Sequence, residues 1–444
     1  MAFVALLAIY AAVIVRSALL SGARRRNVIA ADPAEQSALA ASRFTIPVSV
    51  ITSLEAERPI AIDVLRSLLA LDYPQFEIIA VTDSSRGGAL LELLKREFAL
   101  APRQMFYRRS LPGHDVHAIY GGPRDERLLV VDHVSSQPAG AWNCAVNLAR
   151  YRYIGVVAPD RTVARDALLK AMTPANTDPA SVVAILGHLG APQAAAAVAA
   201  TAGGDTRSAA SGLLEGFDRL QRLRDEVSGV TAPADLGVTT VSPEAFGLWR
   251  RDAVIEAGGF APAKAGEGLD LALRVQQATR QRNADCRILL MPDAGQCRPS
   301  ETLRSSIARQ ARCYHAMLES AWRSRGQLAA STGRVSAVSA VAWHVLPGLL
   351  EGWLVVALPL SIVFGVLGWR LALAAAITVS LAKGVVTNAA LLVQADADGG
   401  TGGGTGRANP VREICLGALE FAVHRPLAAA AAALGSYEFV TGRR

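Results

Sequence analysis

Two aspartates follow apolar runs that are typical of buried strands. Residues 154–157 form a continuous apolar or small run, and Asp160 follows it closely; residues 76–81 form a second run, and Asp83 follows that one. Open α/β sheets place their ligand chemistry at the carboxyl ends of such strands. Asp83 and Asp160 are therefore candidates for binding a ligand or a metal ion. The plainer alternative is that they, like Asp166, are turn or helix N-cap residues.

The elements that must position these carboxylates follow from the hydrophobic pattern. Residues 44–51 are expected to form a strand, residues 60–71 an amphipathic helix and residues 76–81 a second strand. This order is that of a βαβ unit, whose right-handed crossover makes its two strands parallel. Residues 128–131 and 153–157 supply further strands. Asp83 and Asp160 would then face one crevice at the carboxyl edge of an α/β sheet.

Composition narrows the class of partner. The 444 residues are 51% hydrophobic, enough to bury a full core, and the net charge is +7. No basic stripe interleaved with aromatic residues is present, so we do not expect nucleic acid binding. Five scattered cysteines without metal-ligand spacing favour reduced thiols in a cytosolic domain.

Long apolar runs predict a membrane protein. Residues 2–20 are long enough for one span, and residues 345–369 and 371–393 form a membrane hairpin. The cluster Arg24-Arg25-Arg26 after the first run places that flank in the cytoplasm. We therefore expect a multi-pass protein of the inner (plasma) membrane with a cytoplasmic globular domain. Residues 413–444 are either a fourth span or an interfacial helix.

These patterns divide the chain into six parts. They are an N-terminal transmembrane helix (1–22), a linker (23–43), a cytosolic α/β domain (44–334), a transmembrane hairpin (335–394), a flexible loop (395–412) and a C-terminal segment that is membrane-associated or a fourth span (413–444).

Five blocks of the predicted cytosolic domain resemble the family-2 glycosyltransferases in order and spacing. They are residues 47–85, which include Leu-Asp-Tyr-Pro before Phe-Glu-Ile-Ile, and residues 140–168, 246–260, 266–275 and 309–320. The resemblance implies a GT-A fold, with a Rossmann-like, parallel-rich sheet, and inverting transfer from a nucleotide sugar. It also implies a divalent cation, Mg²⁺ or Mn²⁺, that neutralises the leaving diphosphate. Arg309 matches the ceramide-glucosyltransferase-like branch.

The same resemblance gives individual residues their roles. It implies nucleotide contacts from Glu57, Asp83, Asn143 and Asp160, a metal ligand at Asp160, and acceptor or diphosphate contacts from Arg309, Gln310 and Arg312; Glu267 and Asp270 are the candidates to serve as the catalytic base.

Several positions depart from the family pattern, including Thr82, where an acidic residue is common, and Pro138, where a Lys is common; three others bear most directly on the chemistry. Ala158 stands where the first carboxylate of the metal-binding Asp-x-Asp is expected, Gly268 replaces the catalytic Asp, and Cys313 replaces a Trp. Glycine cannot accept the proton of an acceptor hydroxyl. On a helix, Glu267 and Asp270 point about 100 and about 200 degrees away from position 268, so either one would have to rearrange to replace the base.

Two functions remain open at this point. The chain is either a membrane-bound glycosyltransferase that uses a nucleotide sugar, expected to be a UDP-sugar, on the cytosolic face to glycosylate a lipid or an envelope polysaccharide, or a pseudo-glycosyltransferase. In the second case it is a partner subunit in a glycan-assembly complex. The carboxylates of the crevice distinguish the two.

Overall fold

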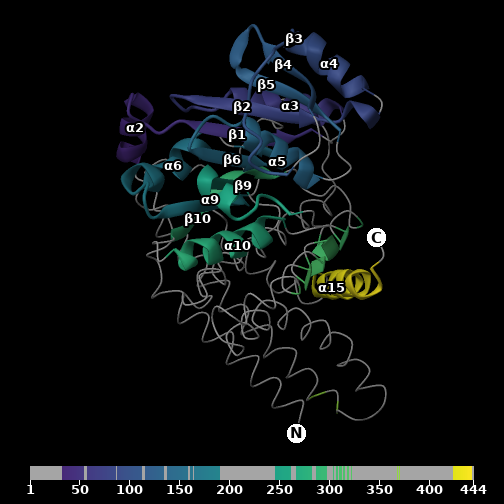
Figure 1. Ribbon diagram of the computed structural model, residues 1–444. Helices are drawn as coiled ribbons and strands as arrows, with labels where there is room; N and C mark the ends of the chain where they lie inside the picture. The colour runs from purple at the N-terminus through teal and green to yellow at the C-terminus, as the bar shows by residue number, and fades with distance from the viewer. Residues whose placement is uncertain are drawn as a thin grey trace, which may run out of the picture. The chain divides into compact units, whose positions relative to one another are not determined.

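A computed structural model describes residues 33–54, 58–86, 88–112, 116–134, 138–158, 161–163, 165–190, 246–261, 267–282, 287–297 and 424–442, together with individual positions between 304 and 370 (Figure 1). The predicted spans in 1–22 and 335–394 and the predicted loop 395–412 lie outside these residues, apart from Gly368 and Arg370. Within the described part of the chain, no helix combines the length and the apolar character needed to cross a bilayer.

The chain forms two compact units. The sheet unit comprises residues 28–190 and 241–298, and the C-terminal unit comprises residues 1–27, 191–240 and 299–444. The described helix of the C-terminal unit is α15 (His424–Thr441). The two units are described separately below.

The sheet unit is built on a ten-stranded mixed sheet in the order β3-β4-β5-β2-β1-β6-β9-β8-β10-β7. Its strands are β1 (Val48–Ser53), β2 (Phe76–Thr82), β3 (Ala101–Pro102), β4 (Val116–Gly122), β5 (Asp125–His133), β6 (Tyr153–Val157), β7 (Arg161–Val163), β8 (Val182–Gly190), β9 (Phe246–Arg250) and β10 (Arg287–Cys297). The predicted α/β class with a parallel-rich sheet is confirmed.

Helices connect these strands and cover both faces of the sheet (Figure 1). They are α2 (Pro33–Ala41), α3 (Arg58–Leu69), the short 3₁₀ helix η2 (Ser84–Arg86), α4 (Ala89–Glu97), α5 (Pro138–Leu148), α6 (Ala167–Thr177), α9 (Arg251–Glu256) and α10 (Glu267–Gln281). Helix α2 falls within the predicted linker. It is joined to the segment before β1 by the Thr45 hydroxyl, which donates to the Leu39 carbonyl at 2.7 Å.

The centre of the sheet is the predicted βαβ unit. Strand β1 pairs in parallel with β2 and with β6, so that Val50 lies beside Ile78 on one side and Gly155 on the other. Strand β2 also pairs in parallel with β5. Every residue of β1, β2 and β6 is buried, as expected for strands covered on both faces.

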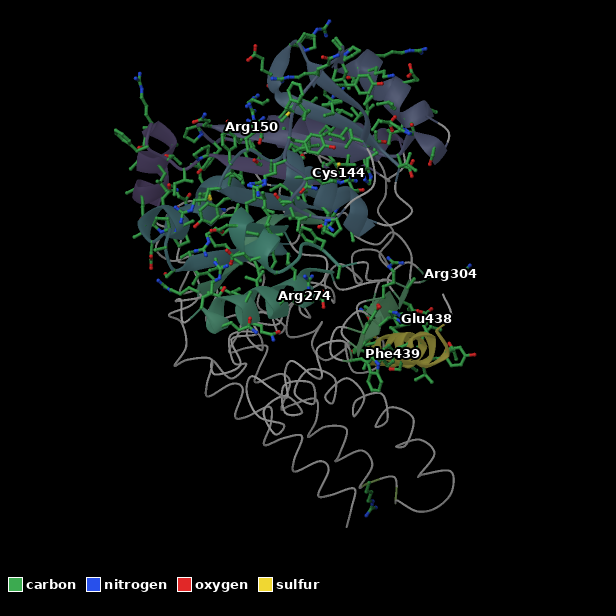
Figure 2. All side chains as sticks on the ribbon, in the orientation of Figure 1. Cys144, Arg150, Arg274, Arg304, Glu438 and Phe439 are labelled. Carbon is green, nitrogen blue, oxygen red and sulfur yellow. The ribbon has the colours of Figure 1, made fainter. Side chains whose placement is uncertain are left out.

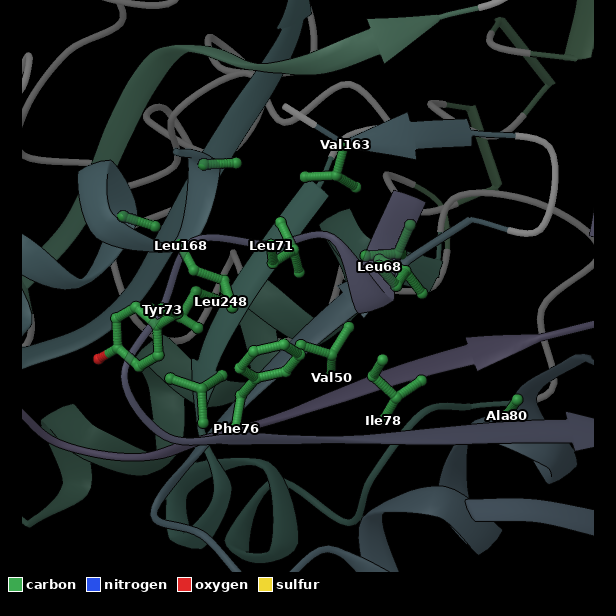
Figure 3. Packing of buried hydrophobic residues seen from close by; sticks show 14 of the residues in the cluster. Val50, Leu68, Leu71, Tyr73, Phe76, Ile78, Ala80, Val163, Leu168 and Leu248 are labelled. Atoms are coloured by element: carbon green, nitrogen blue, oxygen red, sulfur yellow. The ribbon is translucent and has the colours of Figure 1, made fainter. Parts of the chain in front are cut away.

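Alternation along β1 and β2 divides the core into two layers. Val50 and Ile78 pack with Leu68 of α3 on one face, as Figure 3 shows. Ile51 and Ile79 pack on the other face, in the layer that includes α5 and α9. Burying one such side chain contributes about 1.5–3 kcal/mol, and these two layers fix the strand ends on which any site depends.

A buried carboxylate holds the amino edge of the sheet. Glu77 accepts hydrogen bonds from the Ser49 hydroxyl at 2.7 Å, from the Arg150 backbone N–H at 2.9 Å and from the Arg150 Nε at 2.6 Å. It thereby joins β1, β2 and the end of α5. This edge is occupied by structural contacts, whereas a ligand site is expected at the opposite, carboxyl edge.

Strands β3 and β4 form an extension that the sequence analysis did not predict. Strand β4 pairs antiparallel with β5, and β3 pairs antiparallel with β4, so both lie outside the parallel strands at one edge of the sheet. The residues of β4 are mostly half-buried. The continuous apolar signal of a central strand is therefore weak here.

Candidate functional site

Four parallel strands end at one edge of the sheet unit. The neighbouring strands β5, β2, β1 and β6 end at His133, Thr82, Ser53 and Val157 respectively. Asp83 follows β2 directly and is half-buried. This is the edge at which open α/β sheets bind ligands, and the sequence analysis placed the candidate site there.

A buried aspartate in β5 holds the loop that carries Asp83. Asp132 accepts a hydrogen bond from the Ser84 backbone N–H on Oδ1 at 3.0 Å and from the Ser84 hydroxyl on Oδ2 at 2.8 Å. The carboxylate is almost completely buried. We call this pair the Asp132–Ser84 latch; it links the carboxyl end of β5 to the turn after β2.

Sequence analysis did not single out Asp132. The available signal was a charged residue at the end of the apolar run Leu128–Val131, where burial of a charge requires hydrogen-bonding partners. The partner Ser84 lies 48 residues earlier in the sequence. Such a long-range pair is not visible in the local pattern.

Asp83 also has a turn role. Its Oδ1 accepts hydrogen bonds from the Ser85 backbone N–H at 2.9 Å and from the Ser85 hydroxyl at 2.5 Å. An Asp that bonds to the backbone two residues ahead is the usual Asx-turn arrangement, and this was the plainer alternative considered for it. The turn contact and a ligand contact are compatible, because an ionised carboxylate has about four acceptor positions. Nucleotide binding by Asp83 stays a prediction.

Asn143 on α5 is bound to a turn on the same sheet face. Its Oδ1 accepts from the Phe260 backbone N–H at 2.7 Å, and its Nδ2 donates to the Phe260 carbonyl at 2.9 Å. The Trp142 ring meets the Phe260 ring edge-on, with 5.0 Å between their centroids. Asn143 therefore positions the turn after α9, and its predicted nucleotide contact stays a prediction.

Glycine is required at the centre of that turn. Gly258 and Gly259 both have left-handed backbone conformations, with φ of 82° and 74°. A Cβ on Gly259 would overlap Asn143 Oδ1 and would lie 2.8 Å from Leu111 Cδ1. The Gly-Gly pair lets α5 and the Phe260 turn approach closely.

Helix α10 carries both candidate bases. It begins at Glu267, and the buried Asp270 follows within its first turn. Asp270 Oδ2 accepts from Arg274 Nε at 2.9 Å, and Arg274 Nη1 donates to the Ala257 carbonyl at 2.5 Å. Figure 2 labels Arg274 on α10. Asp270 is thus part of an ion pair that joins α10 to the end of α9; its role as a base stays a prediction.

The remaining predicted site residues fall into two groups. Glu57, Asp160 and Arg309 lie outside the described residues, and the side chain of Glu267 is not described. Gln310 is buried and Arg312 is exposed, and both belong to the C-terminal unit. Of the predicted site residues, Asp83 is the one that the structure places at the carboxyl edge of the sheet unit, beside Asp132, which was not predicted.

Two other predicted features have defined positions. Asp166 occupies the N-cap position of α6 but makes no side-chain capping bond; its carboxylate pairs with Lys170 Nζ at 2.9 Å. Cys144 on α5 is a free, buried thiol; the predicted reduced state of the five cysteines stays a prediction. Burial raises the pKa of this thiol to about 12.

The described residues offer no metal centre. Among them, no three His, Cys, Asp or Glu side chains are grouped closely enough to hold an ion. Both oxygens of Asp132 are engaged by Ser84. The predicted metal ligand, Asp160, lies outside the part of the chain that the structure describes.

Comparisons with known proteins identify the fold. No protein-family model matches the chain, and no curated protein matches it in sequence. A mannosyltransferase from Pyrobaculum calidifontis, solved with GDP-Man and Mn²⁺, superimposes with a TM-score of 0.57 at 14% identity, covering 99% of this chain and 98% of that one. S. aureus TarS, solved with UDP-GlcNAc, covers 90% and 93% at 13% identity, with a TM-score of 0.42. The chain has the α/β fold of the mannosyltransferase.

Proposed function

We propose that this chain is a membrane-bound glycosyltransferase-like protein that binds a nucleotide sugar at the carboxyl edge of β1, β2 and β5. The observation that carries the proposal is the Asp132–Ser84 latch, which holds the turn bearing Asp83 at that edge. The fold shared with a nucleotide-sugar-dependent mannosyltransferase supports it.

The chemistry of this edge suits a nucleotide. Asp83 is an acceptor for the N–H and O–H groups of a base or ribose, and the latch keeps its turn in place before the ligand arrives. Helices α3 and α5 each follow one of the parallel strands, so their amino ends lie at this edge. Backbone N–H groups at a helix amino end favour an anionic diphosphate.

The acceptor in this proposal is a lipid or an envelope polysaccharide at the cytosolic face of the membrane. Long apolar runs at residues 2–20, 345–369 and 371–393 support a membrane location. Glu267 at the start of α10 is the proposed base, and Arg309, Gln310 and Arg312 are proposed to contact the acceptor or the diphosphate. These roles come from the resemblance to family-2 enzymes.

A divalent cation is not required by the proposal. Mg²⁺ or Mn²⁺ would neutralise the leaving diphosphate if Asp160 and the substrate phosphates held it. Among the described residues, no three His, Cys, Asp or Glu side chains are grouped closely enough to form such a site. No step proposed for the residues above depends on the ion.

A pseudo-glycosyltransferase that binds nucleotide within a glycan-assembly complex is the second candidate. Gly268 lies in α10 where the family has its catalytic Asp, and Asp270 is paired with Arg274. This ion pair occupies the Asp270 carboxylate in a structural contact between α10 and the end of α9. This pairing favours the second candidate unless Glu267 acts in place of the missing Asp.

Calorimetric titration tests the shared part of both candidates. UDP-GlcNAc and GDP-mannose are titrated into the full chain, with and without Mn²⁺, and into Asp83→Asn. Losing the charge of one hydrogen-bonding carboxylate is expected to weaken binding roughly 10- to 100-fold. Asp63→Asn, an identical change at an exposed position of α3, is the control and should bind as wild type does. Equal binding by the wild type and by Asp83→Asn would contradict the site.

Release of nucleoside diphosphate in the same samples distinguishes the two candidates. Turnover that is lost in Glu267→Gln and kept in Asp270→Asn supports the enzyme. Nucleotide-sugar binding without turnover, even when membrane extract is supplied as a source of acceptor, supports the pseudo-glycosyltransferase.

A further inference from the structure

Helix α15 has one packed side and one exposed side. Ala431, Ala432 and Gly435 are buried, whereas Leu434, Tyr437 and Val440 are exposed. Burial therefore alternates along the helix with helical spacing. Both sides carry apolar residues, so the exposed side is not the polar face of an ordinary amphipathic helix.

The packed side contacts the segment that carries Gln310 and Arg312. A Cβ on Gly435 would overlap the Ala311 carbonyl oxygen and would lie 3.0 Å from Tyr314 Cβ. The close approach at Gly435 brings the backbone of α15 against this segment. Phe439, labelled in Figure 2, extends the contact: its ring centroid is 6.1 Å from that of His315.

The exposed side of α15 is apolar, and an exposed aromatic residue of the same unit lies near Phe439 of the helix. Leu434, Tyr437 and Val440 are 45%, 58% and 81% exposed, and their spacing of three residues keeps them on one side of α15. Trp322 is 60% exposed, and its ring lies 6.5 Å from the Phe439 ring. We call the three side chains of α15, Leu434, Tyr437 and Val440, the exposed strip.

The exposed strip is unusual within the described residues. Those residues include seven large apolar side chains that are exposed; three of the seven form this strip, and a fourth, Trp322, belongs to the same unit. The other three, Phe44, Phe106 and Tyr107, are in the sheet unit. A cluster of this kind marks an interaction surface, whereas single exposed apolar residues are ordinary.

The composition of the strip favours lipid as its occupant. Trp and Tyr side chains, with an apolar body and a polar tip, are enriched where bilayers meet water, and Leu and Val prefer the acyl chains. Arg304 and Arg312, in the same unit, are exposed and have no carboxylate partner among the described residues. Exposed guanidinium groups attract anionic headgroups. Glu438, half-buried, is the one acidic residue of α15.

The sequence of the rest of the unit gives an independent reason to expect lipid at the exposed strip. The unit that contains α15 also contains residues 2–20, 345–369 and 371–393, the three runs whose length and apolarity suit a bilayer. The strip on α15 therefore belongs to the same unit as the part of the chain expected to meet the membrane. A soluble protein partner has no comparable support.

We propose that α15 lies in the plane of the membrane surface, with the exposed strip in contact with lipids whose headgroups are anionic. The inference rests on the proposed membrane location, and it assigns the membrane contact to one face of α15. The opposite face of α15 holds Ala311 and Tyr314 through Gly435, so the bound lipid surface would also position the segment that carries Gln310 and Arg312.

Depth-dependent quenching in reconstituted membranes tests this proposal. A fluorescent amino acid is incorporated at Val440 of the full chain, which is placed in nanodiscs of phosphatidylglycerol and phosphatidylcholine that carry nitroxide-labelled lipid. The control places the same fluorophore at Phe106, a fully exposed position of the sheet unit. We expect strong quenching at 440, with protection from aqueous iodide, and the reverse at 106. Equal iodide access at both positions would overturn the proposal.

Two further measurements test the role of anionic headgroups and separate this proposal from the proposed function. Quenching at position 440 should fall in the double variant Arg304→Gln/Arg312→Gln, and it should also fall when phosphatidylglycerol is omitted. Unchanged quenching in both cases would overturn the role of anionic headgroups. Nucleotide binding is titrated in the same nanodiscs. Intact nucleotide binding without quenching at 440 overturns the α15 proposal alone, whereas quenching without nucleotide binding overturns the proposed function alone.

Discussion

Asp132 and Glu77 are buried carboxylates at opposite edges of one sheet, and their hydrogen bonds give them different uses. Glu77 joins β1, β2 and the end of α5 at the amino edge. Asp132 holds the turn with Asp83 at the carboxyl edge, where a ligand can reach it. Both satisfy the rule that a buried charge needs hydrogen-bonding partners. Position in the sheet, and not residue type, separates the structural carboxylate from the one near a site.

The reactivity of the buried Cys144 thiol gives a prediction about a single residue. Its folded-state pKa is about 12 against an ordinary value of 9.0, because burial disfavours the thiolate. In a variant that retains only this cysteine, we expect the thiol of the folded protein to react with a disulfide reagent at pH 8 on the order of a thousand-fold more slowly than after unfolding in urea. Rapid labelling under native conditions would contradict its burial.

The sign of the pH dependence follows from the same shift. The raised pKa means that the stabilising contribution of the thiol is complete below 9.0, the value of an unperturbed thiol. It is lost as pH rises from there toward about 12, because the unfolded thiol ionises first. Thermal unfolding of the single-cysteine variant should therefore become easier above pH 9.0, more so than in a matched Cys144→Ala variant.

Residue roles were only partly predictable from the sequence. Asp83 was placed correctly after β2 because a local apolar run ends there. Asp132, and the contact of Asn143 with Phe260, depend on residues 48 and 117 positions away, so no local pattern indicates them. Asp270 was considered as a base, but its ion pair with Arg274 was not anticipated although the two lie one helical turn apart.

At the scale of elements, the buried centre of the sheet was the easiest part to predict. Strand β6 has the predicted bounds, and β2 is one residue longer than expected. Strand β1 begins later than predicted, because the residues before it connect to α2. Continuous burial makes such runs apolar throughout, so their signal is strong. The half-buried edge strand β4 lacks this signal and was missed.

The Gly258-Gly259 turn provides a prediction about elements, with a matched control inside the turn. Gly258→Ala introduces a left-handed alanine in open space and should cost roughly 1–2 kcal/mol of stability. Gly259→Ala adds a clash with Asn143 and Leu111, for which overpacking costs about a further 1–3 kcal/mol. Thermal unfolding followed by circular dichroism should therefore give a clearly lower melting temperature for Gly259→Ala than for Gly258→Ala. Equal melting temperatures would show that α5 and this turn are not closely packed.

At the scale of the whole molecule, the chain separates an α/β sheet unit from a C-terminal unit that contains its long apolar runs. The fold class was predictable because it needs only the order and type of the central elements. The composition of the site was not, because it depends on pairs such as Asp132 with Ser84 and Asn143 with Phe260, which are far apart in the sequence. The proposed division of labour is nucleotide binding by the sheet unit and membrane contact by the C-terminal unit.

The central claim is that a nucleotide binds at the carboxyl edge of the parallel strands, beside the Asp132–Ser84 latch. Hydrogen–deuterium exchange of the full chain, with and without saturating UDP or GDP, measures this directly. We expect slower exchange in peptides that contain Asp83–Ser85 and His133, and unchanged exchange in the peptide around Arg150 at the opposite edge. Protection at the Arg150 edge, or no protection near Asp83 while calorimetry reports binding, would contradict the account.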